Sequence, residues 1–142
     1  MPAKKVRQFA LIPIAREKSR HITVVARLTG RPARFIVDTA AGGTFLDFHA
    51  VSHYKLRLSS ASRKAVGVGA AATRMNYVAK HDLKLCEFDL SDTRLLTLDL
   101  SHVNAALVKA RVERVAGVLG ADVLWRHHAM IDYQRGLLLL SV

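Results

Sequence analysis

Short apolar runs, separated by glycine, proline and charged residues, recur along the whole chain. Runs of about four to eight residues that are rich in valine, isoleucine, leucine and phenylalanine are typical of β-strands. Turn residues between two such runs, as in Thr29-Gly30-Arg31-Pro32, favour hairpins. The pattern therefore predicts strands at residues 9–15, 21–28, 33–37, 44–46, 82–90, 93–98, 130–133 and 137–142, with a further apolar strand that begins at Val115 and ends in glycine.

Helical patterns are few and short. Residues 47–54, 104–109 and 121–128 are predicted to be helical, and Asp122 would lie in the first turn of the last helix, where the helix dipole favours a carboxylate. Residues 65–79 are rich in glycine and alanine at their middle, which suits a mobile hairpin. Neither an internal repeat nor a linker is visible. We expect a basic segment at residues 1–20 with a possible first strand, and one compact domain at residues 21–142.

One apolar run leads directly into a carboxylate. Phe35-Ile36-Val37 is followed by Asp38, and the next residues, Thr39 to Gly43, have small side chains. Asp38 is thus predicted to lie where a buried strand ends and solvent is scarce. An ionised carboxylate there is unfavourable unless backbone N–H groups or a shared proton compensate it. Small neighbours let the backbone approach closely enough to do so.

Composition limits the class of protein. The chain has 142 residues, 51% hydrophobic content and a mean hydropathy of +0.16, which favour one globular domain. The apolar run at residues 9–15 contains Pro13 and is too short to span a membrane or to make a good signal peptide, although a trimmed leader or anchor is not excluded. The single cysteine, Cys86, excludes an intrachain disulfide. This fits a reducing compartment such as the cytoplasm but leaves the location open.

The net charge of +11 is concentrated at one end. Residues 1–34 carry nine Lys and Arg against Glu17 alone, whereas residues 35–142 carry thirteen against ten acids. Such a segment can attract nucleic acid or an anionic surface. No nucleic-acid-binding module is visible, however, and aromatic residues make up only 6% of the chain. The basic residues are better explained as a solvated face or as a rim that attracts peptides.

Two segments of the chain form a recognisable pair. The first is Asp38-Thr39-Ala40-Ala41 after an apolar strand, and the second is Leu119-Gly120-Ala121-Asp122-Val123-Leu124, followed by a closing strand at residues 129–133. In this order they resemble the retropepsin-like aspartic peptidases, in particular the single-domain bacterial members, although Ala40 stands where the family usually has glycine. The resemblance covers residues 20–142. It implies an all-β closed barrel with one or two short helices, a flap hairpin and a two-fold dimer.

The resemblance also implies a function. Peptide hydrolysis by water without a metal uses two close carboxylates that share a proton. The chain offers only Asp38 in such a setting, so an aspartic endopeptidase would need Asp38 from each subunit of a homodimer. Thr39 would brace the two loops, and a flap containing Gly67, Val68, Gly69 and Ala70 would cover an extended peptide or protein substrate. No cofactor or metal is expected.

Two alternatives to a working peptidase remain open. Asp38 could simply cap a turn by accepting backbone N–H bonds, and the methyl group of Ala40 could crowd the partner loop. The protein would then be a catalytically weak or inactive peptide- or protein-binding module. A nucleic-acid accessory domain is a third hypothesis.

Other patterns are weaker. Residues 67–72 satisfy G-x-G-x-x-A, but neither a strand before them nor a helix after them is convincing, as dinucleotide binding would require. His49 and His53 could share a helical face, yet without further ligands they are more simply surface histidines. Cys86 has a strand-like context, and Trp125, Met75 and Met130 are expected to be core or packing residues.

Overall fold

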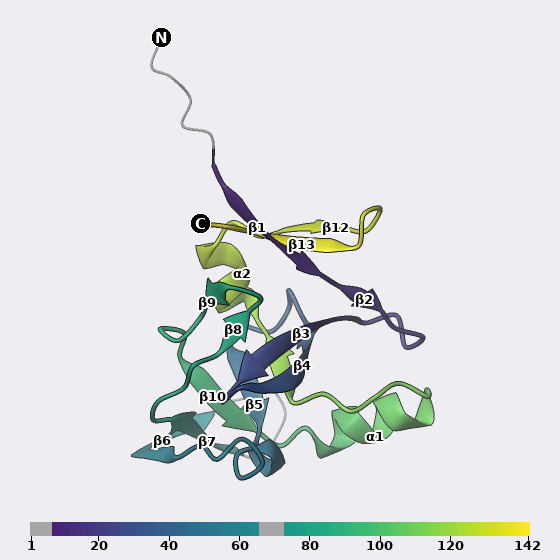
Figure 1. Ribbon diagram of the computed structural model, residues 1–142. Helices are drawn as coiled ribbons and strands as arrows, with labels where there is room; N and C mark the ends of the chain where they lie inside the picture. Colours follow the sequence, from purple (N-terminus) through teal and green to yellow (C-terminus); the bar gives the residue numbers. More distant parts are fainter. Residues whose placement is uncertain (1–6, 66–72) are drawn as a thin grey trace.

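The computed structural model describes residues 7–65 and 73–142, and within them the chain is mostly β (Figure 1). The elements are β1 (Phe9–Pro13), β2 (Ala15–Arg16), β3 (Ile22–Leu28), β4 (Arg31–Val37), β5 (Thr44–Asp47), the 3-10 turn η1 (Phe48–Ala50), β6 (Leu58–Ala65), β7 (Thr73–Val78), β8 (Lys84–Leu85), β9 (Phe88–Asp89), β10 (Leu95–Leu98), α1 (Ser101–Lys109), β11 (Gly117–Leu119), α2 (Ala121–Arg126), β12 (Met130–Asp132) and β13 (Leu137–Ser141). None of the helices in these two ranges is long and apolar enough to cross a membrane.

The strands form two sheets. The larger follows the order β6-β7-β10-β5-β11-β4-β3-β8-β9, with β2 attached to β3, and the smaller follows the order β1-β13-β12. Figure 1 shows the small sheet above the large one, with α2 beneath it and α1 at the opposite end. The predicted mostly-β fold with two helices is confirmed. The strand order runs openly from β6 to β9, however, so the described strands do not close into the predicted barrel.

β11 is inserted between the two strands that flank the candidate loop. It runs parallel to β4, with Val118 beside Ile36, and antiparallel to β5, with Val118 beside Phe45. The first residue of β11 must be glycine, because a Cβ on Gly117 would lie 2.2 Å from the backbone oxygen of Phe45. The insertion brings the second half of the family pattern beside the first.

The core lies between the sheets. Phe35, Leu46, Leu119, Leu138 and Leu140 are among its fully buried side chains. A smaller cluster beneath α1 is formed by Ile36, Leu107, Val112 and Val115. Burial of this apolar surface is the main favourable contribution to folding.

Residues 7–65 and 73–142 cover the small sheet on one face only. Ile12, Leu138 and Leu140 point into the core. On the other face, Leu11 pairs with Leu139 and Leu139 pairs with Met130. Leu11 is 59% exposed and Met130 47% exposed, so an apolar row crosses all three strands of this sheet in contact with solvent. The second face of the leucine run at residues 137–140 is therefore not covered by any part of the chain that the structure describes.

Several predicted boundaries change. The predicted strand at 82–90 is instead the hairpin β8–β9, because Cys86 adopts a left-handed backbone conformation with φ of 52° between them. Residues 47–54 form only one 3-10 turn followed by further turns, and α1 begins at Ser101 rather than residue 104. Trp125 is 79% exposed on α2, so its predicted core position is wrong.

Candidate active site

The Asp38 loop begins where β4 ends against β11. The backbone N–H of Asp38 donates to the carbonyl of Leu119 over 3.0 Å, which continues the β4–β11 pairing by one residue. Asp38 itself is half-buried, whereas Thr39 and Ala40 are exposed. The loop therefore presents its carboxylate at the surface of a single chain, next to two small exposed residues.

The Asp38 carboxylate is held by its own loop. Its Oδ1 accepts a hydrogen bond of 2.8 Å from the backbone N–H of Ala40, and its carbonyl accepts one of 3.3 Å from Ala41. Ala40 is not among the described residues with positive φ. The alanine therefore adopts this turn without backbone strain, although the family pattern has glycine there.

The second half of the pattern closes on the first at Gly120. The N–H of Ala121 donates to the carbonyl of Ala41 over 2.7 Å. A Cβ on Gly120 would lie 2.1 Å from the carbonyl oxygen of Gly43 and 2.8 Å from that of Ala41. Only glycine allows the Asp38 loop and the start of α2 to approach so closely.

Asp122 fixes the far end of the same loop. Its Oδ1 accepts a hydrogen bond of 2.7 Å from the hydroxyl of Thr44, and its Oδ2 accepts one of 3.1 Å from the backbone N–H of Thr44. The Thr44 hydroxyl in turn accepts from the N–H of Gly120 over 3.1 Å. Asp122 lies in the first turn of α2 as predicted, but the sequence pattern gave no sign of its pairing with Thr44.

A hollow of about 270 Å³ lies beside Asp38 and Thr39. The remaining lining residues are Arg20, His21, Ile22, Ile36, Val37, Ile131 and Tyr133. Asp38 is the only carboxylate among the described residues that line the hollow, so these residues of one chain bring a single acid to it. Ile131 and Tyr133 come from β12 and the turn after it, which places the small sheet next to the candidate catalytic loop.

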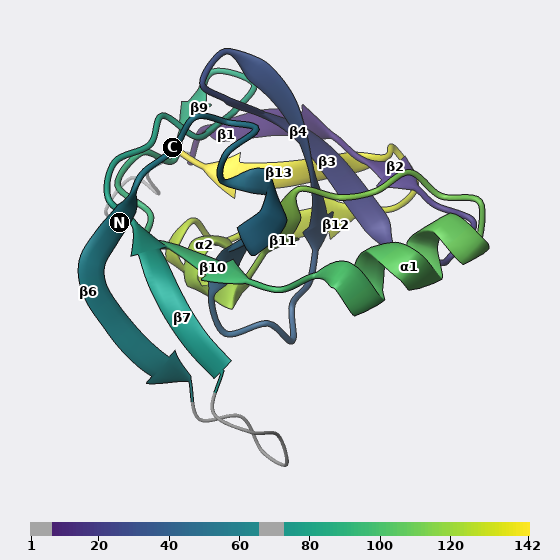
Figure 2. The same ribbon diagram turned by 90° about the horizontal axis from the view of Figure 1, so that it is seen from below.

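The flap that the resemblance implies falls in the sequence between β6 and β7, which pair as antiparallel strands and extend away from the body of the molecule in Figure 2. Gly67, Val68, Gly69 and Ala70 lie outside the described residues. The two strands of the hairpin are joined to the large sheet through β10, with Tyr77 beside Leu96.

The histidine pair of the sequence does not form a common site. His53 packs edge-on against Tyr54, with ring centroids 4.8 Å apart. His49 lies instead near Asp47 and Asp99, and one ligand atom from each of these three residues lies within 4.8 Å of the others. The Asp47 oxygens accept from the N–H groups of His49 and Leu100 and from the amide of Asn104, so Asp47 also binds its own loop to α1.

The chain belongs to the aspartyl protease family, because the model of that family matches residues 24–123, which is more than half of its length. Among solved structures it is similar to a retropepsin-like aspartic protease from Rickettsia conorii, with 17% identity, a TM-score of 0.59, and coverage of 97% of this chain and 95% of that chain. It is also similar to the retroviral protease-like domain of Ddi1 from Leishmania major, with 13% identity, a TM-score of 0.51, and coverage of 84% and 92%. No curated protein sequence matches significantly.

The predicted retropepsin-like fold is therefore confirmed. At these identities the structural likenesses establish the fold, and the family match establishes the class of protein.

Proposed function

We propose that this protein is an aspartic endopeptidase that acts as a homodimer, with Asp38 from each subunit forming the catalytic pair. The observation that carries the proposal is the half-buried Asp38 carboxylate, which lines a hollow without a second acid and adjoins the exposed residues Thr39 and Ala40. Two-fold symmetry is the simplest way for one such loop to meet another.

The apolar row on the small sheet supports the same assembly. Leu11, Leu139 and Met130 lie together on a face that no described part of the chain covers. Because β12 also reaches the Asp38 hollow through Ile131, a second copy bound near Asp38 would lie close to this sheet. Apolar patches of this kind often mark protein–protein interfaces.

The chemistry follows from one proton shared by two carboxylates. The ionised Asp38 accepts a proton from water while the water oxygen attacks the peptide carbonyl carbon, and the protonated Asp38 donates its proton to the carbonyl oxygen. The C–N bond of the resulting diol then breaks, and the leaving amine takes up the proton held by the first carboxylate. The second carboxylate takes a proton back from a hydroxyl of the diol, so that the carboxyl product forms and the pair again holds one proton. The Ala40 N–H bond to Oδ1 orients each carboxylate for this exchange.

The test is cleavage of a fluorogenic peptide library between about pH 3 and pH 8 by the wild type, Asp38→Asn and the control Glu87→Gln, with the mass in solution measured by sedimentation. Two close carboxylates do not ionise together easily, so activity should peak in the acid range as a bell. Asp38→Asn should abolish cleavage, whereas Glu87→Gln, at an exposed turn, should retain it. A rate that stays high in base, or a fully active monomer, would contradict the proposal.

The turn at Asp38 favours a second candidate. A carboxylate that accepts the N–H of the residue two positions later also occurs as a purely structural turn cap. The fold would then serve as a peptide- or protein-binding module without cleavage. Peptide binding by the wild type and Asp38→Asn with equal affinity, and no hydrolysis by either, would favour this candidate.

A further inference from the structure

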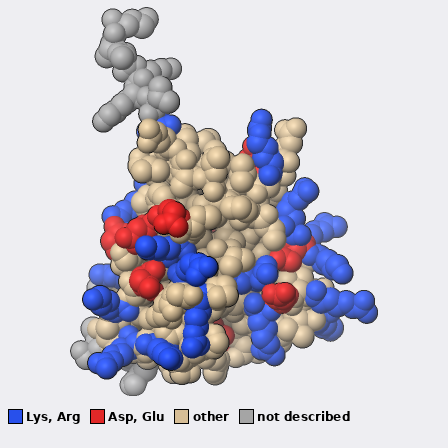
Figure 3. Space-filling model, viewed as in Figure 1, with Lys and Arg blue, Asp and Glu red and all other residues tan. Residues whose placement is uncertain are grey.

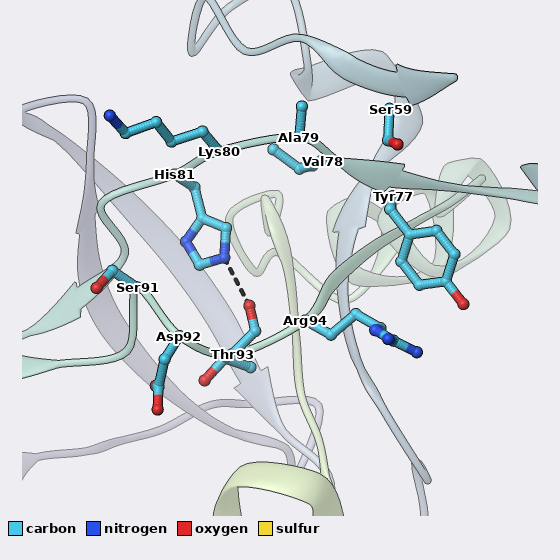
Figure 4. Close-up of a pocket in the computed structure, with 10 residues that line it drawn as sticks. All are labelled: Ser59, Tyr77, Val78, Ala79, Lys80, His81, Ser91, Asp92, Thr93 and Arg94. Carbon is cyan, nitrogen blue, oxygen red and sulfur yellow. Dashed lines mark hydrogen bonds between the residues drawn. The ribbon is translucent and has the colours of Figure 1, made fainter. Parts of the chain in front are cut away.

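Two adjoining hollows lie at the base of the β6–β7 hairpin and share the segment Ala79-Lys80-His81 as a common wall. The first, of about 560 Å³, is also lined by Ser59, Tyr77, Val78 and residues 91–94 (Figure 4). The second, of about 480 Å³, is also lined by Thr29, residues 55–57 and Asp82. We call the pair the root groove. None of its residues lines the hollow beside Asp38.

Hydrogen bonds hold the shared wall in place. The Nε2 of His81 lies 2.7 Å from the carbonyl oxygen of Thr93, as the dashed line in Figure 4 marks. Because a carbonyl can only accept, Nε2 carries the proton, and Nδ1 accepts from the N–H of Leu83 over 3.3 Å. The N–H of Ala79 donates to the carbonyl of Arg57 over 2.9 Å. The groove is thus a preformed feature of the surface.

The charges of the lining are unbalanced. Both of its carboxylates already have partners, since Asp82 accepts from the N–H of Thr29 at 2.7 Å and Asp92 pairs with Arg126 at 2.7 Å. The lining also contains four cationic side chains, none of which pairs with a carboxylate among the described residues: Lys55, Arg57, Lys80 and Arg94. Figure 3 shows Lys and Arg side chains over much of the visible face, including the region of β6 and β7.

Arg94 is already oriented for a ligand. Its guanidinium lies 4.9 Å from the centroid of the Tyr77 ring, next to the first hollow (Figure 4). Stacking on an aromatic face reduces the freedom that the guanidinium would lose on binding a carboxylate. It also occupies a face of Tyr77, and the described linings contain neither Phe nor Trp, so the groove offers few aromatic surfaces on which nucleobases could stack.

We propose that the root groove binds an acidic, extended segment of the protein substrate. Charge complementarity identifies the ligand as a chain rich in Asp and Glu, and the two hollows side by side fit several consecutive residues better than one isolated anion. That the bound protein is the substrate rests on the proposed peptidase function, whereas the binding itself does not.

The position of the groove gives this contact a consequence for cleavage. Tyr77 and Val78 end β7 and Ser59 lies near the start of β6, so the bound segment would lie at the root of the hairpin that we assign as the flap. A substrate held there by its acidic segment would present the rest of its chain to the active site at a raised effective concentration. The groove would then lower KM with little effect on kcat.

Binding is tested on full-length Asp38→Asn protein, so that cleavage cannot interfere. The probe is a fluorescent peptide of alternating Glu and Ser, and its anisotropy is measured at about 0.15 M salt. Lys80→Glu/Arg94→Glu should weaken binding at least about tenfold. The control Lys18→Glu/Arg114→Glu changes the net charge by the same amount at exposed positions outside the groove. It should change the affinity for the peptide less than about twofold.

Three results of this binding experiment would overturn the docking proposal: no binding of the peptide, equal weakening by both double variants, or tighter and groove-dependent binding of a single-stranded oligonucleotide.

A second experiment compares cleavable peptides with and without the acidic tail on active protein. A lower KM for the tailed peptide, lost in Lys80→Glu/Arg94→Glu, supports the proposal. Equal KM values contradict it and leave the peptidase function intact, whereas binding of the peptide with no cleavage of either substrate contradicts only the peptidase function.

Discussion

The carboxylate of Asp122 accepts two hydrogen bonds from one residue, Thr44, and so joins the first turn of α2 to the end of the Asp38 loop. Its two oxygens receive the backbone N–H and the hydroxyl separately, which a carboxylate can do and a carboxamide cannot. The Asp38 loop is thus fixed at its start by β11 and at its end by α2.

Asp122→Asn should destabilise the fold by about 1–3 kcal/mol, because in either orientation the amide nitrogen would face a backbone N–H that the carboxylate now accepts, that of Thr44 or that of Val123, and leave it unpaired. The measurement is urea unfolding at neutral pH. The control is Asp92→Asn, which breaks the exposed pair with Arg126 and should change stability by at most about 1 kcal/mol. Equal effects of the two variants would show that the Thr44 contact has no special role.

Gly120→Ala and Gly42→Ala should differ sharply although both add one methyl group to the same part of the site. The new Cβ at Gly120 would lie 2.1 Å from the backbone oxygen of Gly43, whereas the Cβ at Gly42 would meet nothing within 4 Å. Gly120→Ala should therefore cost about 3 kcal/mol or more, and Gly42→Ala should be neutral or slightly stabilising. Thermal unfolding of both proteins decides, and a stable Gly120→Ala protein would refute the close approach.

Mixing the wild type with Asp38→Asn tests the shared pair directly. If each active site needs Asp38 from both chains, mixed dimers have one carboxylate and do not cleave, so a fourfold excess of the variant should reduce the wild-type rate to about one fifth once subunits have exchanged. A Glu87→Gln protein with intact Asp38 should add activity instead. An unchanged wild-type rate, with exchange demonstrated by mass, would exclude a site made from two chains.

Ala40→Gly tests whether the departure from the family pattern limits catalysis. Ala40 is exposed and its backbone is unstrained, so the variant should fold and lose at most about 1 kcal/mol of stability through the added freedom of glycine. Turnover should rise, because the two loops could approach more closely across the two-fold axis. If the wild type and the variant both form dimers but neither cleaves, crowding by the methyl group is not the obstacle, and the binding-module function gains ground.

His127 should make the fold sensitive to acid. Its Nε2 is buried and has no hydrogen-bond partner among the described residues, and its ring packs edge-on against Phe88 at 4.8 Å. Desolvation, followed by the charge of Arg126, lowers the pKa of His127 below its usual value of 6.5. The unfolded chain thus takes up the proton first, and stability falls as the pH drops below about 6.5 until the folded protein is also protonated.

His127→Phe keeps the ring contact and should remove the part of the acid-induced loss of stability that His127 causes. Urea unfolding between about pH 7.5 and pH 5 would measure the free energy of unfolding of both proteins. His53→Phe is the matched control, since His53 makes the same 4.8 Å edge contact with Tyr54 but is exposed. A pH dependence that is the same in the wild type and in His127→Phe would rule out this role for His127.

The features that local sequence could predict are the ones that local chemistry determines. The apolar strand before Asp38 and the small residues after it predicted the loop, and Gly120 before Asp122 predicted the second half of the site. The Thr44–Asp122 pairing joins residues that no periodicity relates. Cys86 is no indicator of a left-handed turn, so the β8–β9 hairpin was read as a single strand.

Other differences arise from tertiary context. The N-cap residue of α1, Leu100, makes no side-chain capping hydrogen bond, so the residue type at that position did not mark the start of the helix. Trp125 was expected to be a core or packing residue, but its side chain on α2 is exposed to solvent. The open strand order follows from pairings between distant strands, which hydrophobic patterns alone do not specify.

The small sheet can be completed only late in the synthesis of the chain. β1 can pair only with β13, and its register places Phe9 opposite Ser141, so this sheet stays incomplete until residues 137–141 have been synthesised. The Asp38 loop needs only segments up to α2. A nascent chain could therefore form the Asp38 loop before the small sheet is complete, so the apolar row that we propose to meet a second copy would form after the loop it serves.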